Sequence, residues 1–218
     1  MNFNTIKKLR TESTKVDFDT QDSPIEKLND DCLVQIFNFL SIAERIRIQK
    51  VSTTWRDLAK ESWYKVKGLR VDPKFLGLKP CGTKHQYPDI NDHVLDSILE
   101  KCGRYLEKID ISYIDSDCYL ASVAKYCPNI KSISCHSASS NGIQLLSEYC
   151  RNITEFKVQN FVNYDKIEDA LGCLFSKNKN FRVVNIEDSA KLSGECLLKL
   201  PMQKMLTTSG HPVAVSEL

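Results

Sequence analysis

The sequence contains no long hydrophobic run. A membrane-spanning helix needs ~18 or more consecutive apolar residues, and no stretch approaches that length, so we predict no contact with a membrane. Residues 1–22 contain three aspartates and no apolar core. They therefore resemble neither a signal peptide nor a transit peptide, and we expect them to be disordered. The C-terminal Ser-Glu-Leu is similar to the peroxisomal signal Ser-Lys-Leu. Because Glu217 replaces the basic residue of that signal, we do not expect peroxisomal targeting.

An excess of charge of one sign is also missing. Thirty Lys and Arg stand against 28 Asp and Glu, which leaves a net charge of +2, so the composition does not favour a nucleic-acid partner. The nine cysteines are too sparse for a disulfide scaffold, and their number is odd. Free thiols are typical of a reducing compartment, and we expect the protein in the cytoplasm, the nucleus or both.

Motifs for catalysis are absent as well. The sequence has no Cys-x-x-Cys pair, no phosphate loop and no Gly-x-Ser-x-Gly turn. Cys135 and His136 are adjacent, but neighbouring residues of a strand point to opposite faces, so they cannot form a nucleophile–base pair. Cys81, His85 and His93 fall short of the four ligands of a structural zinc site. We therefore predict no enzyme activity, no cofactor and no metal.

What the sequence does contain, between Ser23 and Ala59, is a run that predicts three short helices. Asn29 is a favoured N-cap for the first helix. Ser41 and Glu44 form a capping box for the second, and the third follows Ser52. The first helix carries an amphipathic stripe with the spacing i, i+3, i+4, i+7, formed by Leu33, Ile36, Phe37 and Leu40.

The second helix is expected to direct Ile42, Ile46 and Val51 inward. Its cations are expected to face solvent: Arg45, Arg47 and Lys50. Val34 and Phe39 are apolar but lie off the stripe of the first helix. A unit of fewer than about 40 residues cannot bury this much apolar surface alone. The surplus must meet either the rest of the chain or another protein, and the pattern leaves both possibilities open.

The order and spacing of these residues resemble the F-box family. The matching positions are Leu28, Asp31, Leu33, Ile36, Phe37, Leu40, Ile46, Val51, Trp55 and Leu58. Two positions depart from the family pattern: Asn29 replaces a proline and Ser52 replaces a cysteine. F-box proteins recruit substrates to cullin-based ubiquitin ligases, so the resemblance implies docking on a Skp-type adaptor. The implied contacts are Leu28, Leu33, Val34, Ile36, Phe37, Leu40, Ile46, Val51 and Trp55. Part of this set is expected to close the helical core, and part to face the adaptor with Leu28 and Val34.

The second half of the sequence repeats a short pattern. Apolar residues with the spacing Φ-x-x-Φ-x-Φ begin at Leu106, Ile130, Ile153 and Phe181, about two dozen residues apart. A helical stretch precedes each one, at residues 94–101, 120–126, 143–149 and 170–175, and Leu69 with Val71 indicates an earlier strand. This alternation resembles the leucine-rich repeat. Cys102, Cys127 and Cys150, just before three of the strands, match its cysteine-containing subtype, and we expect them to be buried free thiols.

The predicted fold is therefore α/β: a three-helix F-box at residues 23–67, followed by a short leucine-rich-repeat solenoid at 68–206. Its parallel strands would form the concave face and its helices the convex face. A loop insertion is expected at 72–91, and a tail at 207–218. The position that often holds Asn or Cys holds Ile114, Ala138, Phe161 and Ser189 instead. We therefore expect an irregular solenoid that ends without a full polar capping repeat.

The predicted substrate surface is the concave face of the sheet. Residues between the apolar strand positions must point away from the core. The candidates are Asp110, Ser112, Tyr113, Ser134, His136, Lys157, Gln159, Asn185 and Glu187. This face is polar and mixed in charge, and Tyr113 and Phe161 at the strand ends supply its only nearby aromatic rings. A merely solvated sheet face remains the alternative.

Together, the two resemblances imply a non-catalytic substrate-recognition subunit of a Skp–cullin–F-box ubiquitin ligase. The F-box would dock on the Skp-type adaptor, and through it on the cullin–RING ligase. The repeats would bind a protein destined for ubiquitination and proteasomal degradation. The alternative is a non-catalytic repeat scaffold or assembly factor whose F-box-like helices only cap the solenoid.

Overall fold

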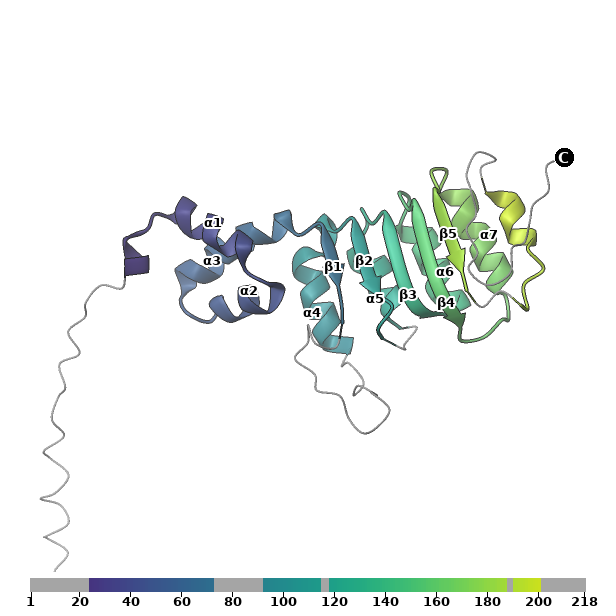
Figure 1. The fold of residues 1–218 in the computed structure, drawn as a ribbon, viewed down its shortest axis with the longest axis horizontal. Helices are drawn as coiled ribbons and strands as arrows, with labels where there is room; N and C mark the ends of the chain where they lie inside the picture. The colour runs from purple at the N-terminus through teal and green to yellow at the C-terminus, as the bar shows by residue number, and fades with distance from the viewer. Residues whose placement is uncertain (1–23, 73–91, 115–117, 188–189, 201–218) are drawn as a thin grey trace, which may run out of the picture.

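A group of short helices is followed by a parallel sheet (Figure 1). The structure is a computed structural model that describes residues 24–72, 92–114, 118–187 and 190–200. The N-terminal segment 1–22, almost all of the predicted loop insertion, Ser189 and the tail 207–218 lie outside the described residues. The predictions made for them stay predictions.

The first unit contains the three predicted helices. They are α1 (Asp30–Phe39), α2 (Ile42–Ile48) and α3 (Thr53–Ser62), flanked by the 3-10 turns η1 (Pro24–Lys27) and η2 (Trp63–Lys65). Asn29 Oδ1 accepts a hydrogen bond from the Cys32 N–H at 2.9 Å, and Ser52 Oγ accepts one from the Trp55 N–H at 3.1 Å. Ser41 and Glu44 form both bonds of the capping box. All three predicted helix starts are confirmed.

A small core lies between α1 and α3. Its buried residues are Leu33, Val34, Phe37, Leu58 and Ala59, with Ile25, Leu40, Ile48 and Trp55 packed around them. The rings of Phe37 and Trp55 lie 5.2 Å apart, centroid to centroid, in a tilted arrangement. Leu33 and Phe37 of the predicted α1 stripe are therefore buried within this helical unit.

The predicted orientation is wrong for two residues, one in α2 and one just after it. Arg45, expected to face solvent, is buried at 6% exposure. Its guanidinium donates hydrogen bonds to the carbonyl oxygens of Leu40 (3.0 Å), Asn38 (2.7 Å) and Ser62. Val51, expected to face inward, is 62% exposed. The end of α1 and the end of α3 offer carbonyls that have no intrahelical donor, and Arg45 satisfies them.

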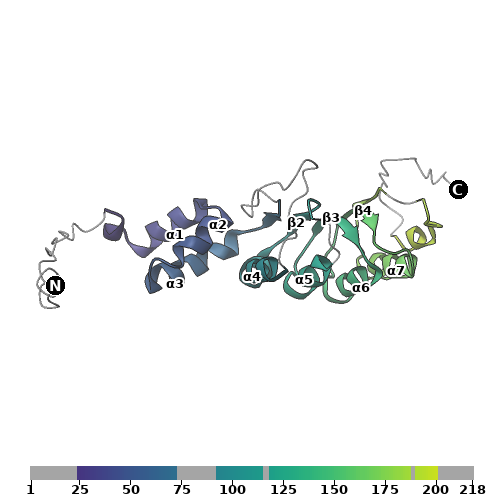
Figure 2. The same ribbon diagram turned by 90° about the horizontal axis from the view of Figure 1, so that it is seen from below.

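Five parallel strands follow in the order of the sequence. They are β1 (Gly68–Arg70), β2 (Lys108–Ile111), β3 (Ser132–Ala138), β4 (Glu155–Phe161) and β5 (Val183–Ile186). The helices between them are α4 (Asp92–Cys102), α5 (Tyr119–Tyr126), α6 (Ser140–Tyr149) and α7 (Ile167–Lys177), with the 3-10 turns η3 (Gly103–Tyr105) and η4 (Glu195–Lys199). Figure 2 shows α4, α5, α6 and α7 side by side on one face of the sheet. The predicted parallel sheet and its helices are confirmed.

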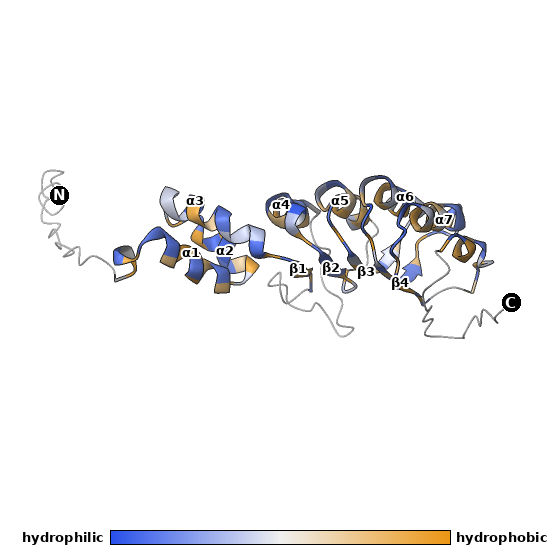
Figure 3. Cartoon of the chain, turned by 90° about the horizontal axis from the view of Figure 1, so that it is seen from above, coloured by the Kyte–Doolittle hydropathy of each residue, from blue (hydrophilic) through white to orange (hydrophobic). Residues whose placement is uncertain are grey.

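The strand register follows the apolar repeat. Ile109 pairs with Ile133, Ile133 with Phe156, and Phe156 with Val184, so these four side chains form one row in the core. The helices turn their apolar sides to the same core, which explains their mixture of hydrophobic and hydrophilic residues (Figure 3). Ile114, Ala138 and Phe161, where Asn or Cys is usual in the repeat family, are also buried.

The residues that precede the strands at one position of the repeat are buried, and two of them contact the backbone of the preceding unit. Cys102, Cys127 and Cys150 are fully buried free thiols, as predicted. The Cys150 Sγ lies 3.5 Å from the carbonyl oxygen of Cys127. The fourth unit has Asn178 at the same position, and its Nδ2 donates to the Cys150 carbonyl oxygen at 3.1 Å. Its Oδ1 accepts a hydrogen bond from the Ile153 N–H at 2.9 Å. The Asn178 side chain therefore bonds the backbone of the preceding unit at two points.

The helical unit also packs on the end of the sheet's core. Trp63 and Val66 are buried members of that core, and Ile42 and Ile46 pack against it. The Arg45 guanidinium carbon lies 6.0 Å from the centre of the Trp63 ring. One side of the helical unit therefore packs against the α/β region.

Candidate functional site

The outer side of α1 is an apolar surface that none of the described residues covers. Cys32, Ile36 and Phe39 have the spacing i, i+4, i+7 and so share one face of the helix, and Leu28 precedes them by one turn. Phe39 is 89% exposed and Ile36 40% exposed, and Leu28 and Cys32 are exposed as well. We call these four residues the outer stripe of α1.

A shallow hollow of about 420 Å³ lies along this stripe. It is lined by Leu28, Asn29, Asp31, Cys32, Gln35 and Ile36. Asn29 is held in place because its side chain caps the helix. The hollow therefore has a fixed apolar wall with a few polar groups at its rim, the composition typical of a protein-docking surface.

The predicted adaptor contacts divide between the core and the surface. Leu33, Phe37 and also Val34, which is only 9% exposed, lie in the helical core. The expectation that Val34 faces outward is therefore wrong, because it lies next to Leu33 on the side turned toward α3. Leu40 and Trp55 are partly buried against the same core, and Ile46 against the core of the sheet. Leu28, Ile36 and Val51 are the members that remain exposed.

On the face of the sheet opposite the helices, four residues form a first polar cluster. The Arg70 guanidinium carbon lies 4.6 Å from the centre of the Tyr113 ring, and Arg70 also bonds the Tyr113 hydroxyl. Arg70 Nε lies 3.8 Å from Asp110 Oδ2. Asp110 Oδ1 accepts from the Ser112 N–H at 3.1 Å and from its hydroxyl at 2.8 Å. The structure thus brings together three predicted substrate-binding residues and adds Arg70.

A second cluster is centred on His136. Its Nδ1 bonds the side-chain oxygen of Gln159, and its Nε2 lies 3.3 Å from Asn160 Nδ2. Ser134, Lys157 and Asn185 form a neighbouring row, because the register pairs Ser134 with Lys157 and Lys157 with Asn185. Asn185 Oδ1 is buried and has no hydrogen-bond partner among the described residues. Glu187 is exposed just beyond β5.

Sequence reasoning missed Arg70 although the signal was present. Leu69 and Val71 were recognised as inward positions of a strand, and the residue between them must then face outward. Asn160 had a weaker signal. It pairs with Ser137 near the end of β4, outside the three apolar positions that define the repeat.

The cysteines of this region lack the character of nucleophiles. Burial raises the pKa of the Cys135 thiol to about 12, and His136 points to the other face of the sheet. Burial likewise raises the pKa of Cys102 and Cys150 to about 12. A thiol must lose its proton to act as a nucleophile or as a metal ligand, so these groups serve packing.

No group of three or more His, Cys, Asp or Glu residues suited to a metal ion occurs among the described residues; Cys81 and His85 lie outside them. In the same part of the chain, no helix is long and apolar enough to cross a membrane.

Comparison with protein families identifies the helical unit. Residues 25–67 match the model described as F-box domain, which covers the three helices and the outer stripe of α1. The chain therefore carries an F-box domain followed by a five-stranded parallel α/β sheet. An F-box domain implies a role as an adaptor subunit in Skp–cullin–F-box ubiquitin ligases, through binding to a Skp-type adaptor. Comparison with curated proteins found no match to this chain.

Proposed function

We propose that the protein is a substrate-recognition subunit of a Skp–cullin–F-box ubiquitin ligase and performs no chemistry itself. One observation carries the proposal: the outer stripe of α1 stays exposed although both neighbouring cores are closed. Its apolar area is available for a partner, and burying it would contribute roughly 25 cal/mol per Å².

In this proposal the α/β region is a leucine-rich repeat of the cysteine-containing subtype. The sequential parallel strands and the single row of apolar residues support that assignment. So does the stacking of Cys127, Cys150 and Asn178 at one position of successive units. Such an array presents a long surface on which a protein substrate can bind.

The substrate would bind the sheet face that carries the two polar clusters. Tyr113 is the aromatic anchor at one end, and it is held over Arg70. His136 lies in the middle strand. Lys157, on the neighbouring strand β4, is exposed and has no ion pair to any described residue. These three residues combine an aromatic ring with hydrogen-bonding and charged groups, the combination found at binding hot spots.

A pull-down with a purified Skp-type adaptor tests the proposal. Wild-type protein should bind, and the Leu28→Asp, Ile36→Asp variant should not, because two carboxylates would be buried in an apolar interface. The control is Val94→Asp, Tyr149→Asp, which places the same charges on exposed apolar residues of α4 and α6. The proposal fails if the stripe variant binds as well as this control.

The packing of Trp63, Val66, Ile42 and Ile46 on the core of the sheet favours the second candidate. In that alternative the helices cap the repeat array, and the protein is a scaffold without a ligase partner. Absence of adaptor binding by the folded wild-type chain would support this candidate.

A further inference from the structure

The loops that lead from helix to strand carry mainly positive charge. They are residues 63–67, 103–107, 127–131, 150–154 and 178–182. Their charged residues are Lys65, Lys67, Arg104, Glu107, Lys131, Arg151, Lys179 and Arg182. Because the strands are parallel and adjacent, these loops lie along one edge of the sheet, linked in series by backbone hydrogen bonds such as Lys131 N–H to Glu107 O (2.8 Å). We call this row of loops the basic edge.

Among the residues that the structure describes, the opposite edge of the sheet has no such excess. The charged residues described in its strand-to-helix loops are Asp72, Asp165, Lys166, Glu187 and Lys191, which include both signs. The small net charge of +2 for the whole chain therefore conceals a separation of charge between two edges. Composition alone gives no sign of it.

The helix dipole explains only part of this charge. Cations in the last turn of a helix are stabilised by the partial negative charge there, which accounts for Lys101, Lys125 and Lys177. The basic-edge cations lie beyond those turns, where the effect of the dipole has fallen off. A further reason is needed for their presence.

Ion pairing accounts for few of these cations. Glu107 lies 2.7 Å from Lys131 Nζ and 4.0 Å from Lys67 Nζ, and the Lys131 ammonium lowers the pKa of the Glu107 carboxyl. The remaining cations of the edge have no carboxylate within ion-pair distance among the described residues: Lys65, Arg104, Arg151, Lys179 and Arg182.

Tyrosines accompany these cations in successive units. Tyr64, Tyr105, Tyr126 and Tyr149 lie in the loops or at the helix ends next to them. Lys65 Nζ and the Arg104 guanidinium carbon each lie 5.8 Å from the ring centre of the adjacent tyrosine, and Lys125 Nζ lies 4.6 Å from that of Tyr126. Tyr149 is 59% exposed. Tyr and Arg are among the residues enriched at protein-binding hot spots.

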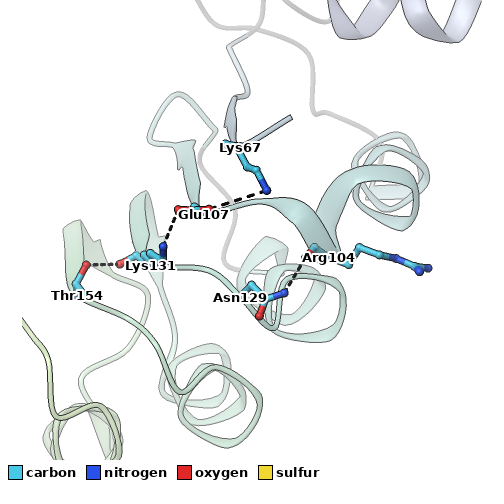
Figure 4. A network of polar contacts seen from close by, with 6 residues as sticks. All are labelled: Lys67, Arg104, Glu107, Asn129, Lys131 and Thr154. Carbon is cyan, nitrogen blue, oxygen red and sulfur yellow. Dashed lines mark hydrogen bonds and ion pairs between the residues drawn. The ribbon is translucent and has the colours of Figure 1, made fainter. Parts of the chain in front are cut away.

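The middle of the basic edge is hollowed. A polar depression of about 310 Å³ is lined by Lys67, Arg104, Tyr105, Asn129, Lys131 and Asn152 around Glu107. Figure 4 shows the contacts that order it: Lys67 and Lys131 flank Glu107, and Asn129 reaches the Arg104 carbonyl. The Asn129–Arg104 bond measures 2.8 Å and ties one loop to the next.

We propose that the basic edge binds an acidic segment of a partner protein, laid across the strands through the hollow around Glu107. The unpaired cations and the tyrosines would contact its carboxylates. A peptide has a backbone N–H at nearly every residue that can donate a hydrogen bond to the Glu107 carboxylate, whereas the Glu107 carboxylate repels the regularly spaced phosphates of a nucleic-acid strand. This surface is separate from the outer stripe of α1 and from the polar clusters on the sheet, so the inference does not depend on the ligase role.

The test measures binding of a fluorescein-labelled peptide of alternating Glu and Ala to the full chain by fluorescence anisotropy at low salt. The same peptide with Gln in place of Glu is the ligand control. The Arg104→Glu, Arg151→Glu variant reverses two exposed cations of the basic edge. Its matched control, Lys166→Glu, Lys191→Glu, makes the same change in net charge at the opposite edge, and circular dichroism verifies that both remain folded.

The proposal expects the Glu peptide to bind the wild type, with an affinity that falls as salt is added. The basic-edge variant should bind about tenfold or more weakly and the control variant nearly as well as wild type. Equal losses in both variants would mean that only net charge matters and would overturn the proposal. So would failure of the Glu peptide to bind, or binding of labelled single-stranded RNA in its place with the same dependence on Arg104 and Arg151.

Discussion

The guanidinium of Arg45 in α2 donates a hydrogen bond to the carbonyl oxygen of Ser62, the last residue of α3. The same group bonds the carbonyls of Asn38 and Leu40 at the end of α1. The Arg45 side chain thus links α2 to the ends of α1 and α3 by hydrogen bonds. It lies directly beside Trp63, which belongs to the core of the sheet. Arg45 is therefore the residue that joins the three helices of the F-box domain to one another, next to the side on which they pack against the α/β region.

Replacing Arg45 should destabilise the protein strongly. Arg45→Ala leaves three carbonyls without their donor, and hydrogen bonds to charged groups each contribute about 1.5–3 kcal/mol. We expect the free energy of unfolding to fall by about 3 kcal/mol, measured by urea denaturation. Arg47→Ala, on the exposed side of the same helix, should change it by less than about 0.5 kcal/mol. Similar effects of the two substitutions would contradict the role given to Arg45.

Local sequence patterns correctly predicted the helix starts and the strands. The predictions that failed concern residues whose burial depends on contacts with distant parts of the chain. Asn29, Ser41 and Ser52 cap their helices through residues three positions away, so the sequence contains the whole interaction. The bonds of Arg45 reach Ser62, which is 17 residues away, and a cation in an amphipathic pattern is ordinarily assigned to solvent. Val34 was assigned to the surface for a related reason, because its burial depends on where α3 lies.

On the sheet, the repeat predicted which residues share its outward face, because alternation in a strand is a local rule. It did not predict that Arg70 would stack on Tyr113, since the two are separated by an entire unit. The basic edge was missed for another reason. Each loop contributes only one or two cations, and they gather only when the units stack.

Asn178 offers a test of the equivalence between the repeat units. Asn178→Ala should lower the free energy of unfolding by about 2–3 kcal/mol, since the buried Ile153 N–H and Cys150 carbonyl lose their partner. Asn178→Cys should cost less, because a thiol can repeat the contact that Cys150 makes with the Cys127 carbonyl. If cysteine is no better tolerated than alanine in urea denaturation, the position is not equivalent to that of Cys150.

The buried thiols should react slowly with alkylating reagents. In the native protein, alkylation should be slow at Cys102, Cys127 and Cys150, and fast at the exposed Cys32, Cys118 and Cys173. Mass spectrometry of timed labelling reactions would distinguish the two groups. Rapid native labelling of the first three would show that they are not packed as described.

The buried thiols should also make stability depend on alkaline pH, with a defined sign. Burial raises the pKa of Cys102 and Cys150 from the ordinary value of 9.0 to about 12. Between these values the unfolded chain releases protons that the folded chain retains, so stability is full below pH 9.0 and falls as the pH rises toward 12. Urea denaturation at a series of alkaline pH values should show this loss, and Cys102→Ala, Cys150→Ala should reduce its slope.

The proposed substrate surface predicts separable functions within one chain. Alanine at Tyr113, His136 and Lys157 together should reduce capture of substrates, because it removes the aromatic, hydrogen-bonding and charged groups of the sheet face. Adaptor binding should persist, since β2, β3 and β4, which carry or precede these residues, lie apart from α1 (Figure 1). Proximity labelling in cells with the wild-type and triple-variant proteins would compare their captured partners. An unchanged set of partners would exclude this face as the substrate site.

Calorimetric titration of a purified Skp-type adaptor into the full chain measures whether the outer stripe of α1 is a docking surface. We expect saturable binding with a negative heat-capacity change, because the apolar outer stripe of α1 becomes buried. We also expect that Ile36→Asp weakens the affinity by at least about tenfold, equivalent to 1.4 kcal/mol, while Val94→Asp leaves it unchanged. No binding by the folded wild type, or equal affinity for Ile36→Asp and Val94→Asp, would contradict this role of the outer stripe.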